Sequence, residues 1–141
     1  MKILIDTNIL LAIVPKLSKH RWAYDALREG KFELVISNEI LEEYEEILGS
    51  FYHPDFANVV VQELLNLPNV HLVDVYYKFL LISADADDDK FVDAAICANA
   101  DHIITHDKHF KILETIPFPK VSTLSLEGFL QIYLNDNQLF A

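Results

Sequence analysis

The sequence predicts an α/β fold with a central parallel sheet covered by helices on both faces. Short apolar runs alternate with longer segments of helical periodicity along the chain. No repeat, low-complexity tract or Gly/Ser-rich linker interrupts this alternation, and 141 residues is an ordinary length for one domain. Strands that alternate with helices form right-handed crossovers between parallel strands. We therefore expect one three-layer α/β/α domain over residues 1–141.

The first half of the chain contains three predicted strands and the helices between them. Apolar runs predict strands at 2–5, 33–36 and 70–75. Helical periodicity covers 7–14, 18–30, 38–48 and 54–67. Ser37 and Asn38 can cap the third of these helices, and Gly49 is expected to end it.

The second half continues the alternation with shorter elements. A helix is predicted at about 88–99, followed by a strand at 102–105. A short helix at 108–113, a strand near Val121 and a helix from Ser125 complete the chain.

Acidic residues follow two of the predicted strands. Asp6 comes directly after the first strand, and Asp107 follows the strand at 102–105 with one residue between. The carboxyl ends of parallel strands meet at one edge of a sheet, where ligands gather near a topological switch point. Both carboxylates should therefore project from the same edge.

Five glutamates on the helix at 38–48 differ in where they point. Its apolar residues form one stripe: Ile40, Leu41, Tyr44, Ile47 and Leu48. Three glutamates point away from that stripe and fit a solvated face: Glu39, Glu42 and Glu46. Glu43 and Glu45 lie on opposite borders of the buried face, and the periodicity leaves open which of them reaches a cleft.

Aspartates gather at the start of the helix at 88–99. Asp89 borders its apolar stripe in the first turn, and Asp93 lies one turn further on. Asp87 or Asp88 can cap the helix. The helix dipole stabilises an exposed carboxylate there by less than about 1 kcal/mol, which does not account for a cluster.

A cation explains this crowding best. Two carboxylates roughly 5 Å apart repel by about 3 kcal/mol at an effective dielectric constant near 20. If Asp6, Glu43, Asp89 and Asp107 lie together, several such pairs repel one another. Mg²⁺ and Mn²⁺ prefer such oxygen ligands, and the scarcity of cysteine argues against structural zinc. A bound metal ion can activate water and hold a phosphate oxygen.

Composition bounds the environment and the partners. The formal charge of −11 is unlike that of a general nucleic-acid binder. A basic segment that includes Lys19, Arg21 and Arg28 could contact an RNA backbone, although a solvated helix face explains it equally well. The lone Cys97 fits a reducing cytosol. We expect a cytoplasmic protein, because neither a secretory signal nor an apolar run long enough to span a membrane is present.

With these residues placed, the chain resembles a PIN domain. The resemblance rests on "ILIDTNILL" (3–11), "ISNEILEEYEEIL" (36–48) and "DDDKFVDAAICANADHIITHD" (87–107). The last segment is especially similar to the VapC-type toxins of toxin–antitoxin pairs.

The resemblance assigns roles to individual residues. It implies that the metal ligands and catalytic acids are Asp6, Glu43, Asp89 and Asp107. It selects Glu43 over Glu45, and Asp89 because this residue precedes Asp107 by 18 positions. The aspartate run leaves this third acid ambiguous by a residue or two. Supporting roles are implied for Thr7, Asn8, Asp93 and Thr105.

The activity that the resemblance implies is RNA cleavage dependent on Mg²⁺ or Mn²⁺. An antitoxin partner and a homo-oligomer are further expectations. His106 stands where small or basic residues are commoner, and both His106 and His109 are alternative metal ligands, although loop histidines are usually plain polar surface.

Three other interpretations compete with a PIN ribonuclease. A haloacid-dehalogenase-like phosphatase needs a second aspartate two residues after the first, where this chain has Asn8. A response-regulator receiver needs paired acids after the first strand, and "LIDTN" has one. A catalytically inactive PIN fold that binds RNA or protein is disfavoured because all four acids are present.

Overall fold

The fold is built on a parallel sheet, as the alternation of apolar runs and helices predicts. The computed structural model describes residues 1–82 and 86–139, so five residues of the predicted domain lie outside the described part. Within these ranges the sheet has five strands in the order β3-β2-β1-β4-β5, and each pairing is parallel. The strands are β1 (Lys2–Ile5), β2 (Glu33–Ser37), β3 (Val70–Val73), β4 (His102–Ile104) and β5 (Thr123–Leu124).

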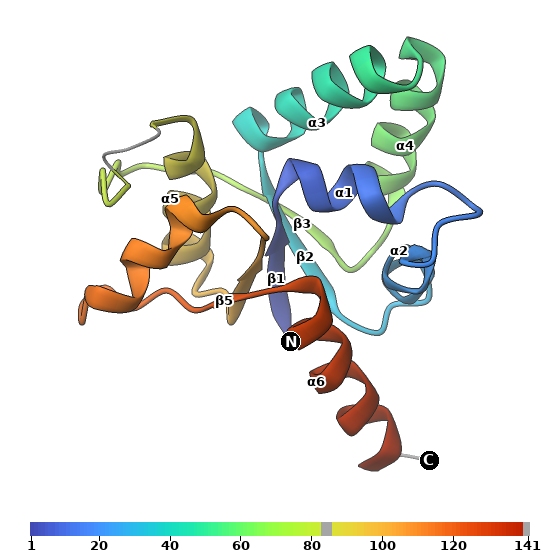
Figure 1. Cartoon of the computed structure of the whole chain (residues 1–141). Coiled ribbons are helices and arrows are strands. Elements are labelled where there is room, and N and C mark those ends of the chain that lie inside the picture. The colour runs from blue at the N-terminus through green and yellow to red at the C-terminus, as the bar shows by residue number, and fades with distance from the viewer. Residues whose placement is uncertain (83–85, 140–141) are drawn as a thin grey trace.

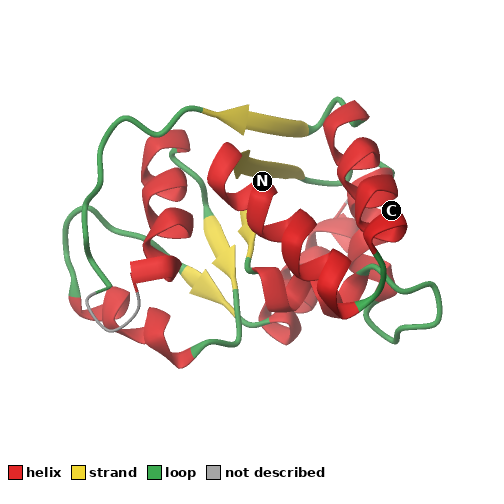
Figure 2. Ribbon diagram, turned by 90° about the horizontal axis from the view of Figure 1, so that it is seen from above, coloured by secondary structure: helices red, strands yellow, loops and turns green. Residues whose placement is uncertain are grey.

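Helices cover both faces of this sheet. They are α1 (Thr7–Ile13), α2 (Arg21–Arg28), α3 (Asn38–Phe51), α4 (Pro54–Asn66), α5 (Asp89–Ala98) and α6 (Leu126–Leu139), with 3₁₀ turns η1 (Ala86–Asp88) and η2 (Lys108–Thr115). Helix α5 lies on one side, and α1, α2, α4 and α6 lie on the other (Figure 1). Seen from above, the strands run between helices of the two sides (Figure 2). The predicted three-layer architecture is confirmed.

The middle of the sheet is fully buried. Ile3 and Leu4 of β1 and Ile103 and Ile104 of β4 are all completely buried. Continuous apolar runs are typical of parallel strands that have helices on both faces. Fully burying one such side chain stabilises the fold by about 1.5–3 kcal/mol. The two strands that precede Asp6 and Asp107 are therefore firmly packed.

The prediction that Gly49 ends α3 is wrong. The helix continues to Phe51, and Gly49 lies inside it. A Cβ at this position would lie 3.6 Å from the Cα of Pro54 and 3.7 Å from the Cβ of Ala57. Glycine here accompanies the close approach of α3 and α4. The last strand also differs, because it lies at Thr123–Leu124 instead of near Val121.

The strand order creates a switch point between β1 and β4. From β1 the chain moves outward through β2 to β3, then returns to the other side of β1 to form β4 and β5. The crossover helices change face at this return, and ligands of such sheets bind at the carboxyl ends of the strands beside the switch point, here β1 and β4. Asp6 and Thr105 are the first residues beyond these two ends.

Candidate functional site

Thr105 holds the carboxylate of Asp6 at the switch point. The backbone N–H of Asp6 donates to the Ile104 carbonyl at 3.0 Å, which extends the β1–β4 ladder to the strand ends. The Thr105 hydroxyl donates to Asp6 Oδ2 at 2.8 Å and accepts from the backbone N–H of Asp107 at 3.0 Å. One hydroxyl therefore fixes the placement of both aspartates.

Glu43 approaches the end of β1 from α3. The Thr7 hydroxyl donates to Glu43 Oε2, and Lys90 Nζ lies 2.8 Å from Glu43 Oε1. The hydroxyl of the buried Tyr44 donates to the Ile5 carbonyl, which ties α3 to the end of β1. Glu45 is exposed and lies in a separate hollow beside Gly49. The geometry therefore separates the two glutamates that helical periodicity left equivalent.

The electrostatics show that three acids share one neighbourhood. Asp6 is 6% exposed, and this burial is the main reason why its pKa is raised above the ordinary value. The Thr105 hydroxyl and the Thr7 backbone N–H oppose the shift, while the charges of Asp107 and Glu43 add to it. Asp6, Glu43 and Asp107 therefore repel one another when all three are ionised.

Asp89 and Asp93 point toward the chain segment that follows β3. Asp89 is 6% exposed, and its Oδ1 accepts from the backbone N–H of Ile82 at 2.8 Å. Asp93 is 4% exposed, and its Oδ1 accepts from the backbone N–H of Phe79 at 3.0 Å. Burial raises the pKa of Asp93, and the charge of Asp89 raises it further. Both carboxylates fasten this segment to α5.

Asp88 lies beside Asp107. It occupies the N-cap position of α5, but its side chain makes no capping hydrogen bond. One ligand atom each from Asp88, Asp107 and His109 fall within 4.8 Å of one another. His109 Nδ1 is 3.6 Å from Asp88 Oδ2 and 3.5 Å from Asp107 Oδ1. The resemblance implied Asp89 as the third acid, ambiguous by a residue or two, and Asp87 or Asp88 was expected to cap the helix. The two assignments differ by one residue in a run of aspartates.

The donor set fits a hard divalent cation. Asp88, Asp107 and His109 offer two carboxylates and one imidazole nitrogen within 4.8 Å of one another, and Asp6 and Glu43 add carboxylates close enough for the charges of Glu43 and Asp107 to act on Asp6. Carboxylate oxygens are the ligands that Mg²⁺ and Mn²⁺ prefer. A cation would also relieve the repulsion that helps to raise the pKa of Asp6. His106, the other candidate histidine, lies 3.0 Å from Glu127 Oε2 instead.

The remaining predicted residues are less central. Asn8 and Lys19 are exposed. Arg21 Nε donates to Asp25 at 2.9 Å, and Arg28 Nε lies 3.0 Å from Glu63 Oε1. Both arginines belong to α2, which leads into the beginning of β2 and so to the edge of the sheet opposite Asp6. Contact of these arginines with an RNA backbone stays a prediction.

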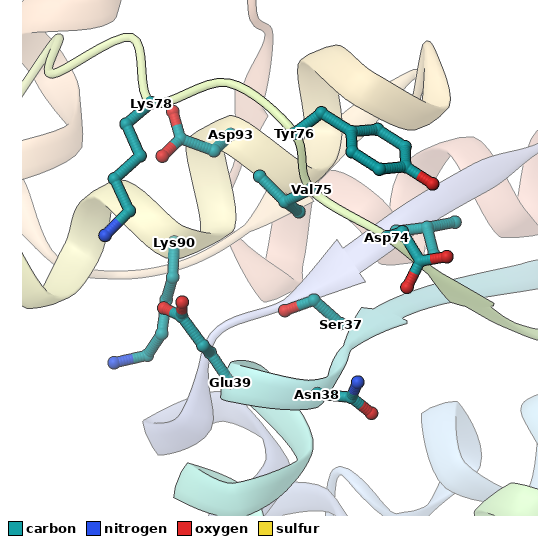
Figure 3. Close-up of a pocket in the computed structure, with 10 residues that line it drawn as sticks. Ser37, Asn38, Glu39, Asp74, Val75, Tyr76, Lys78, Lys90 and Asp93 are labelled. Carbon is teal, nitrogen blue, oxygen red and sulfur yellow. The ribbon is translucent and has the colours of Figure 1, made fainter.

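We call Asp6, Glu43 and Asp107 the acidic cluster. A pocket of about 490 Å³ opens beside it, and Lys90, which lines the pocket, contacts Glu43. Its walls come from the N-terminus of α3, from the end of β3 with the segment after it, and from α5 (Figure 3). Sequence reasoning missed this pocket, because residues 74–78 have no periodicity that indicates which side chains face inward.

Comparison with protein families agrees with this geometry. The family model described as "PIN domain" matches residues 2–109. The chain belongs to the PIN domain family. Membership in this family argues against the phosphatase and the receiver interpretations. No curated protein sequence matches the chain.

Three solved structures have the same fold as this PIN domain. A chain of VapBC2 from Rickettsia felis, bound to a DNA fragment from the promoter, is 17% identical with a TM-score of 0.60, over 89% of this chain and 98% of that chain. A chain of DNA-bound VapBC from Salmonella typhimurium is 14% identical with a TM-score of 0.57, over 89% and 98%. A chain of VapBC-1 from nontypeable Haemophilus influenzae is 17% identical with a TM-score of 0.60, over 90% and 99%.

In the part of this PIN domain that the structure describes, no helix combines the length and the apolar character needed to cross a membrane.

Proposed function

We propose that this PIN domain is an endoribonuclease that depends on Mg²⁺ or Mn²⁺. One observation carries the proposal. Asp6, Glu43 and Asp107 converge on the switch point, and the charges of Glu43 and Asp107 help to raise the pKa of the buried Asp6 carboxyl. Like charges at one crevice are stable when a cation lies between them. When bound, such a metal ion supplies a water of lowered pKa and positive charge against phosphate oxygens.

The chain's own residues would hold and orient this centre. Asp6, Glu43, Asp107 and one of the neighbours Asp88 and Asp89 would hold the metal ion, and the distance to Asp107 favours Asp88. Thr105 keeps Asp6 and Asp107 in register, and Thr7 orients Glu43. Lys90 places an ammonium group beside Glu43, where a phosphate backbone would find a counter-charge.

We further propose that the protein is the toxin of a toxin–antitoxin pair and works in the cytoplasm. The support is the likeness of its fold to chains of three VapBC assemblies. The partners would be an RNA substrate, an antitoxin protein and a second copy of this chain in a homo-oligomer.

The test of the proposed activity is cleavage of single-stranded RNA by purified protein with Mn²⁺. Asp6→Asn and Glu43→Gln should each lower the rate by about 100-fold or more, because each removes a charged group from the reacting centre. Glu45→Gln is the matched control, since Glu45 is exposed on the same helix, and its rate should stay within about twofold of wild type. Equal rates for wild type and Asp6→Asn would identify the activity as a contaminant.

A further inference from the structure

The pocket beside the acidic cluster has the size and lining of a ligand site. Its volume of about 490 Å³ lies within the range of small-molecule sites, about 300–1,000 Å³. It opens at the carboxyl ends of β2 and β3, one strand away from the metal centre proposed above. Sites in open parallel sheets form at these ends. The location therefore extends the proposed active site along the sheet edge.

Lys90 connects the pocket with the acidic cluster. Its side chain lines the pocket, and its ammonium group lies 2.8 Å from Glu43 Oε1. Lys78 adds a second cation to the lining. In a chain with a net charge of −11, these two lysines give the opening positive groups beside its three carboxylates. The two lysines suit a ligand in which a phosphate lies next to a polar ring, as in a nucleotide.

The walls are rich in hydrogen-bond acceptors. Glu39, Asp74 and Asp93 all line the pocket, and their side chains surround it in Figure 3. A carboxylate accepts through two oxygens with about four lone-pair sites, and at Asp93 the backbone N–H of Phe79 occupies one of them. Such walls select a ring that presents N–H donors. Guanine presents two adjacent donors on its Watson–Crick edge, whereas uracil presents one.

An aromatic ring stands at the rim of the pocket. Tyr76 lines the pocket and is still 78% exposed, so its ring is accessible for stacking. Stacking on exposed aromatic rings is the usual way in which proteins hold unpaired bases. The next residue, Tyr77, is 76% exposed but is not part of the lining, which makes it a matched control.

We propose that this pocket binds one nucleobase of single-stranded RNA, with guanine preferred, next to the phosphate at the acidic cluster. The proposal rests on the ribonuclease function proposed above and names its substrate preference. Tyr76 stacks on the base, Asp93 and Glu39 accept from its edge, and Lys90 lies between the base and the phosphate.

Binding of labelled RNA pentamers in EDTA tests the pocket independently of catalysis. The probes are UUGUU, UUAUU, UUCUU, UUUUU and a pentamer with an abasic central position, measured by fluorescence anisotropy at low salt. UUGUU should bind most tightly, and the abasic pentamer most weakly. Tyr76→Ala should weaken UUGUU binding roughly 5- to 150-fold, the range of a lost base–aromatic stack. Tyr77→Ala should change it less than about twofold.

Asp93→Asn tests the origin of the guanine preference. The amide oxygen can still accept from the Phe79 N–H, while its NH₂ group replaces one acceptor with a donor. The ratio of affinities for UUGUU and UUUUU should therefore fall toward one, with folding preserved in the circular dichroism spectrum. Equal binding of all five pentamers, or equal effects of Tyr76→Ala and Tyr77→Ala, would overturn the proposal.

The two proposals fail in different ways. If wild type cleaves RNA in Mn²⁺ but shows no dependence on the central base or on Tyr76, the base pocket is wrong while the ribonuclease stands. If base- and Tyr76-dependent binding occurs in EDTA without cleavage in Mn²⁺, the pocket stands and the protein is an RNA-binding PIN fold.

Discussion

At the scale of single residues, the hydrogen bonds and neighbouring charges of each carboxylate define the site. Asp6 is held by Thr105 and by the Thr7 backbone, yet its pKa is raised because burial and two neighbouring carboxylates outweigh these hydrogen bonds. The folded state therefore binds the Asp6 proton more tightly than the unfolded chain does. Its contribution favours folding at low pH, and this contribution is lost as the pH rises through the folded-state pKa.

Asp6→Asn should therefore stabilise the metal-free protein, and more so at higher pH. In EDTA, the difference in Tm between the variant and wild type should grow as the pH rises above the unfolded pKa of about 3.9 toward neutrality. Asparagine can still accept from the Thr105 hydroxyl, so packing is conserved. Thermal unfolding at several pH values measures this difference. A constant difference from pH 4 to pH 7 would show that Asp6 titrates as it does in the unfolded chain.

How far the sequence could predict the site also depends on single residues. Helical periodicity placed Glu43 and Glu45 symmetrically about the stripe, and the contacts with Thr7 and Lys90 that distinguish Glu43 come from distant elements. The run Asp87–Asp89 places three carboxyls within one turn. Only the packing of α5 against the end of β4 decides which of them lies beside Asp107.

At the scale of elements, α5 holds the segment that forms the outer wall of the pocket. Residues 74–82 contain no helix or strand, and two of their backbone N–H groups donate to the buried carboxylates of Asp89 and Asp93. Buried polar groups need such partners, because leaving one unsatisfied costs about 1–3 kcal/mol. The two aspartates therefore act as clamps along one face of the helix.

Removing each clamp should release one backbone amide. Asp93→Ala should accelerate hydrogen exchange of the Phe79 amide, and Asp89→Ala that of the Ile82 amide, by about tenfold or more because each loses its acceptor. Asp93→Asn and Asp89→Asn are the controls, since an amide oxygen can accept the same bond. Amide exchange followed by NMR gives both rates. Uniform acceleration across α5 would indicate loss of the helix instead of loss of a clamp.

The elements themselves were largely readable from the sequence, because each helix and strand has its own apolar period. The errors arose where a tertiary contact determines the local structure. Gly49 is a normal helix stop by composition, but α3 continues past it to Phe51 and packs beside α4 there. The strand predicted at 70–75 ends at Val73 instead, and residues 76–82 have no apolar period, so the pocket that this segment helps to form could not be predicted.

At the scale of the whole molecule, the parallel sheet brings together acids that lie far apart in the sequence. Asp6 and Thr105 are separated by 99 residues, yet they are joined by a hydrogen bond because β1 and β4 pair in register. The proposed metal centre would therefore exist only in the folded chain. A ligand that binds only the folded state stabilises it by linkage, by about 2.7 kcal/mol at a free concentration 100 times its Kd.

Mn²⁺ should accordingly raise the Tm of wild type above its value in EDTA, by roughly 5–15 °C for a domain of this size at saturation. Asp88→Asn should lose most of this gain, because Asp88 lies beside Asp107 and His109. Asp89→Asn should keep it, because Asp89 accepts from Ile82. Differential scanning fluorimetry with a Mn²⁺ titration compares the three proteins. The reverse order would assign the third ligand to Asp89, as the resemblance to PIN domains implies. Identical melting curves of wild type in EDTA and Mn²⁺ would mean that these carboxylates do not enclose a metal ion, and the ribonuclease mechanism would fail with them.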